Sequence, residues 1–142
     1  MANPDGADPR FTQEVRTASA LWAAATTAKT TLKDTVNAVL LCQFGPFGGL
    51  ITGLKALPLA TVTGRALYLL RRRPDVDGAT DAHLARSVTL PAQTLATTGG
   101  ITATAFPFSR DEPLKGEPDE EIWVGVAVTG IDVAFDAEIE DF

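Results

Sequence analysis

The clearest pattern along the chain is an alternation of apolar and polar residues close to the C-terminus. From Ile131 to Glu140, apolar residues alternate with mostly acidic ones, which predicts a strand with one buried and one solvated, acidic face. Ile122–Val128 alternates in the same way, so we expect the two segments to form a hairpin that reverses at Thr129 and Gly130. Trp123 would then lie opposite the valine row, where we expect a neighbouring subunit to cover it.

Short apolar runs separated by clusters of Gly, Pro and Asp continue through most of the chain, which is typical of many short strands. We predict eight strands: Ala18–Thr27, Val36–Phe44, Leu50–Leu57, Arg65–Arg72, Leu84–Leu90, part of Thr94–Phe106, Ile122–Val128 and Ile131–Ile139. A helix competes only over Ser19–Leu32, which holds five alanines. Its four threonines favour strand and turn, because β-branched side chains lose rotamer freedom in a helix.

Eight antiparallel strands in one domain of this size close most naturally as two stacked sheets. We therefore predict an all-β fold, an eight-stranded antiparallel β-sandwich with jelly-roll connectivity, over residues 18–142. An immunoglobulin-like arrangement is less favoured because paired cysteines are absent. Residues 1–17 are polar and lack periodicity, which predicts an extended N-terminal arm that orders on a partner. We expect residues 45–49 to form a hairpin loop and residues 113–121 a long connection.

Composition and charge narrow the classes of partner. The 142 residues are enough for one domain with its own core, and their formal net charge is −6. An acidic total argues against nucleic acid as a direct partner, since phosphate binding needs a concentrated cationic face. Two uncharged runs, 35–54 and 87–109, are broken by Gly and Pro, so we expect no membrane span. The N-terminal sequence does not resemble a signal peptide.

The residue types needed for catalysis or metal binding are scarce. His83 is the single histidine and Cys42 the single cysteine, and no serine lies in a Gly-x-Ser-x-Gly elbow. Zinc and cupin-type metal sites need several such ligands. The carboxylates that follow Asp75 resemble a calcium loop, but Arg86 stands where a bidentate Glu is required, so we expect a turn. We therefore predict a protein that is not an enzyme, without cofactor or metal, and a buried Cys42 thiol.

Several charged and apolar residues indicate contact between subunits instead. Three adjacent arginines end a strong strand just before Pro74, where bidentate pairing with carboxylates would hold them best. We expect them to pair with the acidic face of the last strand of a neighbouring copy, although both sets could also be solvated surface. The expected interface residues are Phe11, Arg71, Arg72, Arg73, Trp123, Asp132, Asp136 and Glu138.

About a third of the chain, residues 27–73, carries a resemblance to a known kind of protein. It combines an Asn-Ala-Val-Leu-Leu strand at 37–41, a Gly-rich loop at 45–49, and Thr-Val-Thr-Gly leading into the strand at 65–70. In this it resembles small structural proteins of tailed-bacteriophage particles. The resemblance implies a jelly-roll protein of the virion exterior, of the capsid-decoration (cement) or head-spike type, with no catalytic residues. Its partners would be other copies of the chain, with a trimer favoured, and the major capsid protein or other virion proteins.

Two further functions remain open. A carbohydrate- or receptor-binding module of the phage particle would share the sandwich fold, but its usual surface is rich in Asn and Gln, and only two Asn and three Gln occur here. A neck or tail component would also share the fold. A hydrolase would have to rely on His83, which we expect to be structural or solvated.

Overall fold

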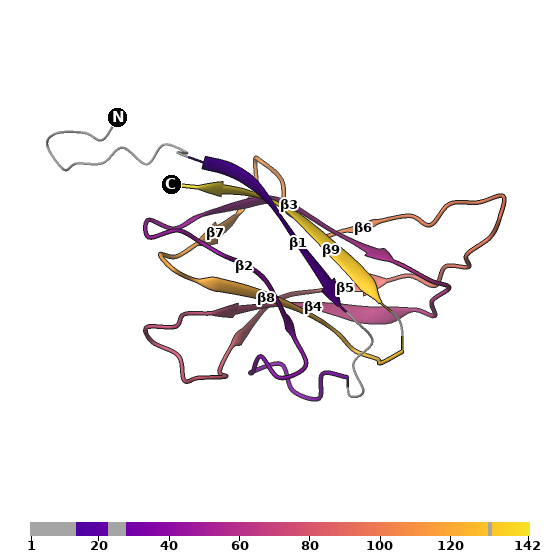
Figure 1. The fold of residues 1–142 in the computed structure, drawn as a ribbon, viewed down its shortest axis with the longest axis horizontal. Helices are drawn as coiled ribbons and strands as arrows, with labels where there is room; N and C mark the ends of the chain where they lie inside the picture. Colours follow the sequence, from indigo (N-terminus) through magenta and orange to yellow (C-terminus); the bar gives the residue numbers. More distant parts are fainter. Residues whose placement is uncertain (1–13, 23–27, 131) are drawn as a thin grey trace, which may run out of the picture.

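The computed structural model describes residues 14–22, 28–130 and 132–142, which form nine strands and no helix (Figure 1). The strands are β1 (Glu14–Trp22), β2 (Val39–Gln43), β3 (Gly49–Pro58), β4 (Arg65–Arg72), β5 (His83–Leu90), β6 (Thr104–Ala105), β7 (Leu114–Gly116), β8 (Glu121–Val126) and β9 (Val133–Asp141). Every pairing between them is antiparallel. The predicted all-β class is therefore confirmed.

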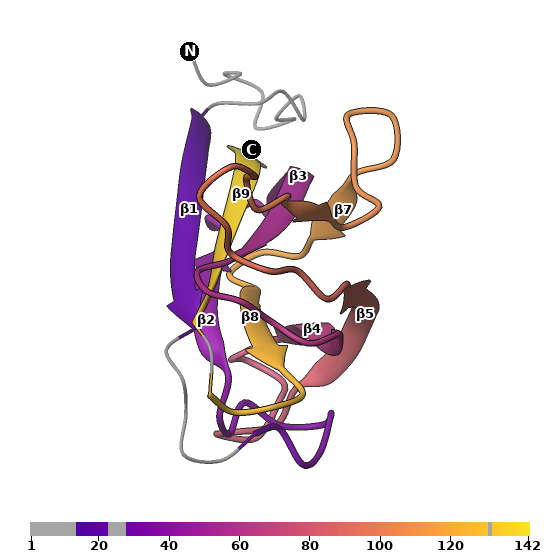
Figure 2. The same cartoon turned by 90° about the vertical axis from the view of Figure 1, so that its right-hand side faces the viewer.

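The strands form two sheets that stack as a sandwich (Figure 2). The five-stranded sheet has the order β1-β9-β3-β6, with β7 also paired to β3, and the four-stranded sheet has the order β2-β8-β4-β5. Apart from the short β7, this is the double Greek-key order of a jelly roll. The predicted connectivity is confirmed, with one strand more than the eight expected.

The core lies between the sheets and is built from the alternating residues that the sequence indicates. Val124 and Val126 of β8 and Phe135 and Ile139 of β9 are fully buried, while residues between them face outward. Complete burial of such a side chain stabilises the fold by about 2 kcal/mol. The inward face predicted for these two segments is confirmed within β8 and β9, whereas Val128, beyond the end of β8, is 47% exposed.

The predicted hairpin between the last two long strands is wrong. β8 pairs with β2 and β4, whereas β9 pairs with β1 and β3, so the connection crosses from one sheet to the other. Gly130 has the positive φ of a turn, at 113°, but several residues separate the strands and can span the roughly 10 Å between sheets. The loop at 45–49 was likewise expected to be a hairpin, and it joins β2 and β3 of different sheets.

The start of β1 and the additional strand β7 also differ from the expectation. β1 begins at Glu14, so residues 14–17 belong to the sheet rather than to the arm. Arg16 fixes this end of the strand, since its Nε donates to Asp141 Oδ2 of β9 at 2.6 Å. The rest of the arm, including Phe11, lies outside the described residues. The connection expected at 113–121 contains the short strand β7, which pairs with the start of β3. The three residues of β7 are too few to show the alternation of apolar and polar residues that predicts a strand.

Candidate functional site

The outer face of the five-stranded sheet carries a hollow of about 510 Å³, which we call the sheet groove. Its size falls in the range of small-molecule sites. The residues that line its open side include Thr17, Ser19, Gly53, Lys55, Phe108, Asp136 and Glu138. They come from β1, β3, β9 and the segment after β6, so the groove depends on contacts between distant parts of the chain.

Strand register arranges the groove as two rows across the sheet. The first row runs from Thr17 of β1 through Glu138 of β9 to Gly53 of β3. The second row lies two residues earlier in β9 and joins Ser19, Asp136 and Lys55 in the same strand order. Because residues two apart in a strand share a face, both rows point outward together. The groove therefore presents two hydroxyls, two carboxylates and one ammonium group side by side.

The missing side chain at Gly53 gives the groove its depth. A Cβ placed there would meet Glu138 Oε2 at 3.7 Å, an ordinary van der Waals distance, so space rather than crowding surrounds this position. The pairing of β3 with β9 shifts register between Ile51 and Gly53, as in a β-bulge. Bulges re-aim the residues around them, and here the shift places Gly53 opposite Glu138.

The polar groups of the groove are only partly engaged within the chain. Ser19 Oγ donates to Asp136 Oδ1 at 2.7 Å, which holds one carboxylate in place. In the described part of the chain, Lys55 Nζ and the Glu138 carboxylate form no ion pair and no side-chain hydrogen bond. Both side chains are exposed, so their polar atoms are free to form hydrogen bonds with water or with another molecule.

An aromatic side chain forms the wall of the groove that is remote from β1. Phe108 stacks on the buried Phe106, with ring centroids 6.3 Å apart, and the guanidinium of Arg86 lies 6.0 Å from the Phe108 ring centroid. Arg110 Nη1, in the same segment, lies 3.4 Å from Glu140 Oε1 of β9. These contacts fix a half-buried ring beside the open face of the sheet.

The three arginines expected at an interface are paired within the chain. Arg71 binds Glu120, with Nη2 at 2.6 Å from Oε1, and Glu120 is almost fully buried. Arg72 Nη1 lies 2.9 Å from Glu121 Oε1, and the exposed Arg73 lies 3.8 Å from Asp75. The carboxylates of these pairs therefore come from β8, the residue before it and the loop after β4, not from β9.

The remaining expected interface residues lie on opposite sides of the sandwich. Asp136 and Glu138 belong to the sheet groove, and Asp132 is half-buried just before β9. Trp123 lies on the outer face of the four-stranded sheet, opposite the valine row as predicted, and its Nε1 donates to Glu121 Oε1 at 3.1 Å. Among the described ones, the structure thus brings Asp136 and Glu138 together in the groove, and Arg72 and Trp123 together at Glu121 Oε1, to which both donate.

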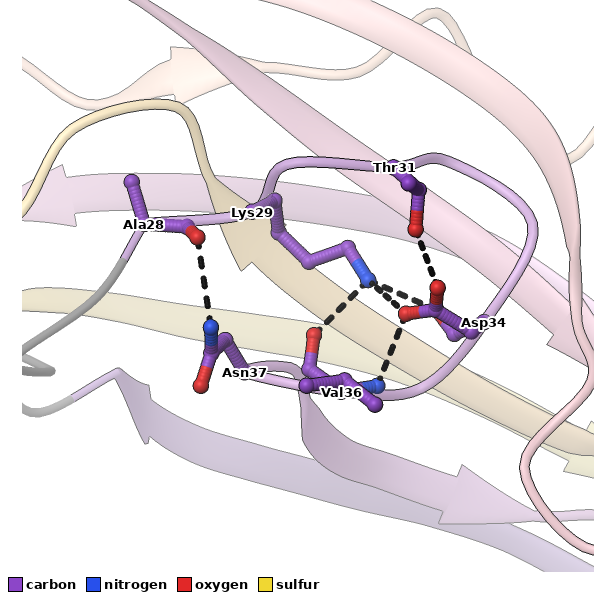
Figure 3. Close-up of polar contacts among 6 residues, drawn as sticks. All are labelled: Ala28, Lys29, Thr31, Asp34, Val36 and Asn37. Atoms are coloured by element: carbon purple, nitrogen blue, oxygen red, sulfur yellow. Dashed lines mark hydrogen bonds and ion pairs between the residues drawn. The ribbon is translucent and has the colours of Figure 1, made fainter.

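A buried lysine fixes the loop that precedes β2, a role that sequence reasoning missed (Figure 3). The Lys29 side chain is fully buried, and its Nζ donates to Asp34 O at 2.7 Å, Asp34 Oδ1 at 2.8 Å and Val36 O at 2.8 Å. Its stem lies over Gly125, where a Cβ would meet Lys29 Cγ at 3.1 Å. All three ammonium protons have an acceptor, so this lysine stabilises the loop and is not available for chemistry.

Acid should weaken this contact. The hydrogen bond from Lys29, and next that from Thr31, lowers the pKa of Asp34 below its ordinary value of 3.8. A lowered pKa means that the folded state favours the carboxylate, so its contribution is complete above pH 3.8 and is lost as the pH falls further. We expect the difference in unfolding free energy between wild type and Asp34→Asn to shrink from pH 7 to pH 3 in urea titrations. An undiminished difference at pH 3 would contradict this linkage.

The two side chains considered for catalysis or metal binding, Cys42 and His83, are buried and exposed, respectively. Cys42 is buried, and desolvation raises the pKa of its thiol to about 12. The exposed His83 lies 3.2 Å from Asp77, whose other oxygen accepts from the backbone N–H of Arg73 in a turn. Among the described residues no three His, Cys, Asp or Glu side chains are placed to hold a metal ion. That part of the chain also contains no helix that could cross a membrane.

Known proteins provide no relative on which to base a function. No protein-family model, curated protein or solved structure matches the chain. A jelly roll does not specify an activity, because the fold carries many unrelated ones. The function therefore has to be inferred from the two outer faces of the sandwich.

Proposed function

We propose that this chain is a non-enzymatic structural protein of the exterior of a tailed-bacteriophage capsid, of the cement or head-spike type. It acts as a homo-oligomer, with a trimer favoured, and binds the major capsid protein or other virion proteins. The resemblance of residues 27–73 suggests this role. The structural observation that supports it most is an apolar row on the outer face of the four-stranded sheet.

The apolar row crosses all four strands of that sheet. In register, Leu40 of β2 lies beside Trp123 of β8, Trp123 beside Leu70 of β4, and Leu70 beside Leu84 of β5. Leu40 and Leu84 at its ends are 42% and 41% exposed, Trp123 is half-buried, and Leu70 between them is fully buried. Single exposed leucines are ordinary, but partly exposed apolar residues aligned on one sheet face around a buried leucine are suited to contact with another protein. Burying this row between copies would also cover Trp123.

A second feature suited to contact is the loop between β5 and β6, which extends away from the sandwich (Figure 1). Residues 91–103 carry no charge, and Leu95 is 60% exposed. Gln93 closes the base of the loop, because its side-chain amide donates to Thr102 O at 2.8 Å and accepts from Thr102 N at 2.7 Å. A neutral, braced projection can approach a neighbouring protein without desolvating charges.

Disrupting the apolar row should abolish self-association. We expect native mass spectrometry to find wild-type oligomers, with a trimer favoured, and monomers for the double variant Leu40→Ser, Leu84→Ser. Leu59→Ser provides a matched control, since Leu59 is 47% exposed but lies just after β3, a strand of the other sheet. The control should remain oligomeric and bind empty phage capsids in co-sedimentation as wild type does.

Two results would count against this role. A wild-type protein that stays monomeric at all concentrations and does not sediment with capsids would contradict it directly. Oligomers that survive the double variant would remove the apolar row from the interface. Imaging of intact particles distinguishes shell decoration from a vertex spike, neck or tail component, because these positions differ in copy number.

A further inference from the structure

The sheet groove lies on the face opposite the apolar row and has a chemistry of its own. Its two rows place hydroxyl, carboxylate and ammonium groups around the floor at Gly53, beside the ring of Phe108. We infer that the sheet groove binds a neutral saccharide. This activity is additional to capsid binding and does not depend on it.

The hydrogen-bonding groups of the groove match those of a sugar. Each sugar hydroxyl can donate one hydrogen bond and accept others, so a ring with several hydroxyls needs both acceptors and donors nearby. Asp136 and Glu138 supply acceptors. A hydrogen bond from a hydroxyl group to a carboxylate is short and about twice as strong as a hydrogen bond between two neutral groups. Lys55 supplies donors, while Thr17 and Ser19 can do either.

The two carboxylates of the groove select against an anionic ligand, and its ammonium group selects against a cation placed beside Lys55. An anionic ligand would approach Asp136 and Glu138, and a cationic one would approach Lys55, since register places Lys55 directly beside Asp136. Like charges in close contact repel even at a solvated surface. A neutral polyhydroxyl ligand can use all three groups without this penalty.

Shape and apolar contact fit the same class of ligand. The hollow of about 510 Å³ lies beside Gly53, where an added Cβ would make only ordinary van der Waals contact, with the Glu138 side chain. Phe108 cannot turn away freely, because it is stacked on the buried Phe106. A half-buried aromatic ring beside polar groups offers apolar surface to a sugar ring, which has apolar C–H patches between its hydroxyls. Because the site is shallow and hydrated, we expect affinity for one ring to be about millimolar.

The test is direct binding to the isolated full-length protein. Saturation-transfer NMR would screen glucose, galactose, mannose and their N-acetylhexosamines, with N-acetylneuraminic acid and glucosamine as anionic and cationic comparisons. We expect at least one neutral sugar to bind wild type. Gly53→Leu should abolish this signal by filling the floor, and Glu138→Gln should weaken binding about tenfold by removing a charge-assisted acceptor. Glu112→Gln, an exposed carboxylate outside the groove, is the matched control and should bind as wild type.

Three outcomes would overturn the inference. Binding of none of the neutral sugars would remove the activity, and binding of the charged sugars alone would contradict the charge argument. A neutral sugar that binds Gly53→Leu and Glu138→Gln as tightly as wild type would occupy another site. Thermal melting of each variant shows whether it is folded, and Glu138→Gln keeps the test valid if Gly53→Leu is not. Since no capsid is present, failure here leaves the capsid proposal standing.

Discussion

Replacing Lys29 with methionine is expected to lower the free energy of unfolding by about 3 kcal/mol. Methionine keeps most of the apolar stem that lies over Gly125 but removes the ammonium group. The Asp34 and Val36 carbonyls then lose the Lys29 donor, and the Asp34 carboxylate keeps only its hydrogen bonds from Thr31 and the Val36 N–H. The cost is large because the Lys29 side chain is fully buried, so a charged donor is removed from inside the loop and methionine offers no replacement.

Urea unfolding followed by circular dichroism measures this loss, with Lys33→Met as the matched control. Lys33 lies in the same loop, but its side chain is exposed and it contributes only its carbonyl, which accepts from Ala82 N. The control should therefore stay within about 0.5 kcal/mol of wild type. Equal stabilities of the two variants would show that the buried ammonium group does not hold the loop.

The faces of the strands could be predicted from the sequence, but their partners could not. The period of two in Ile122–Val128 and in β9 identifies which residues are buried. It says nothing about which sheet a strand joins, because a strand facing the core from either side has the same pattern. The turn residues at 129–130 therefore predict a hairpin, although the two strands lie in different sheets.

The charged interface shows the same limit. The sequence predicts that Arg71 and Arg72 pair with the acidic face of the last strand in a neighbouring copy. Their partners are Glu120 and Glu121, which lie 49 residues away in the chain and beside β4 only through the pairing of β4 with β8. Such a contact depends on sheet order and has no local signal.

The sheet groove could be anticipated only in part. Asp136 and Glu138 belong to an acidic row that the alternation reveals. Gly53 gives no sign of its role, since a glycine in a strand is compatible with a bulge, a close approach or a hollow. Only the register of β9 with both β1 and β3 places this gap beside two carboxylates and two hydroxyls.

The two proposals are compatible because they use opposite faces of the sandwich. The apolar row lies outside the four-stranded sheet and the sheet groove outside the five-stranded one. Two sheets stacked about 10 Å apart separate these surfaces by the whole core. Copies that associate through the apolar row would therefore leave the groove open to solvent and to a saccharide.

The second large effect is expected from Gly116→Ala, which should destabilise the fold by about 2 to 3 kcal/mol. Gly116 ends β7 against the core, and an added Cβ would overlap Cε2 and Cδ2 of Phe44 and lie 2.5 Å from its Cζ. Phe44 is almost fully buried, so its ring cannot move without displacing other core residues. Urea unfolding measures the loss, and Gly99→Ala, where no heavy atom lies within 4 Å of the added Cβ, is the control.

A smaller side chain at position 44 should relieve the strain. Phe44→Leu alone is expected to cost stability by loss of buried area, but in the Gly116→Ala background it also removes the ring that the new methyl group meets. The double variant should therefore be more stable than the sum of the two losses predicts, by about 1 kcal/mol or more. Strict additivity would mean that the cost at Gly116 arises in the unfolded chain or the backbone. It would then not come from the packing of β7 against Phe44.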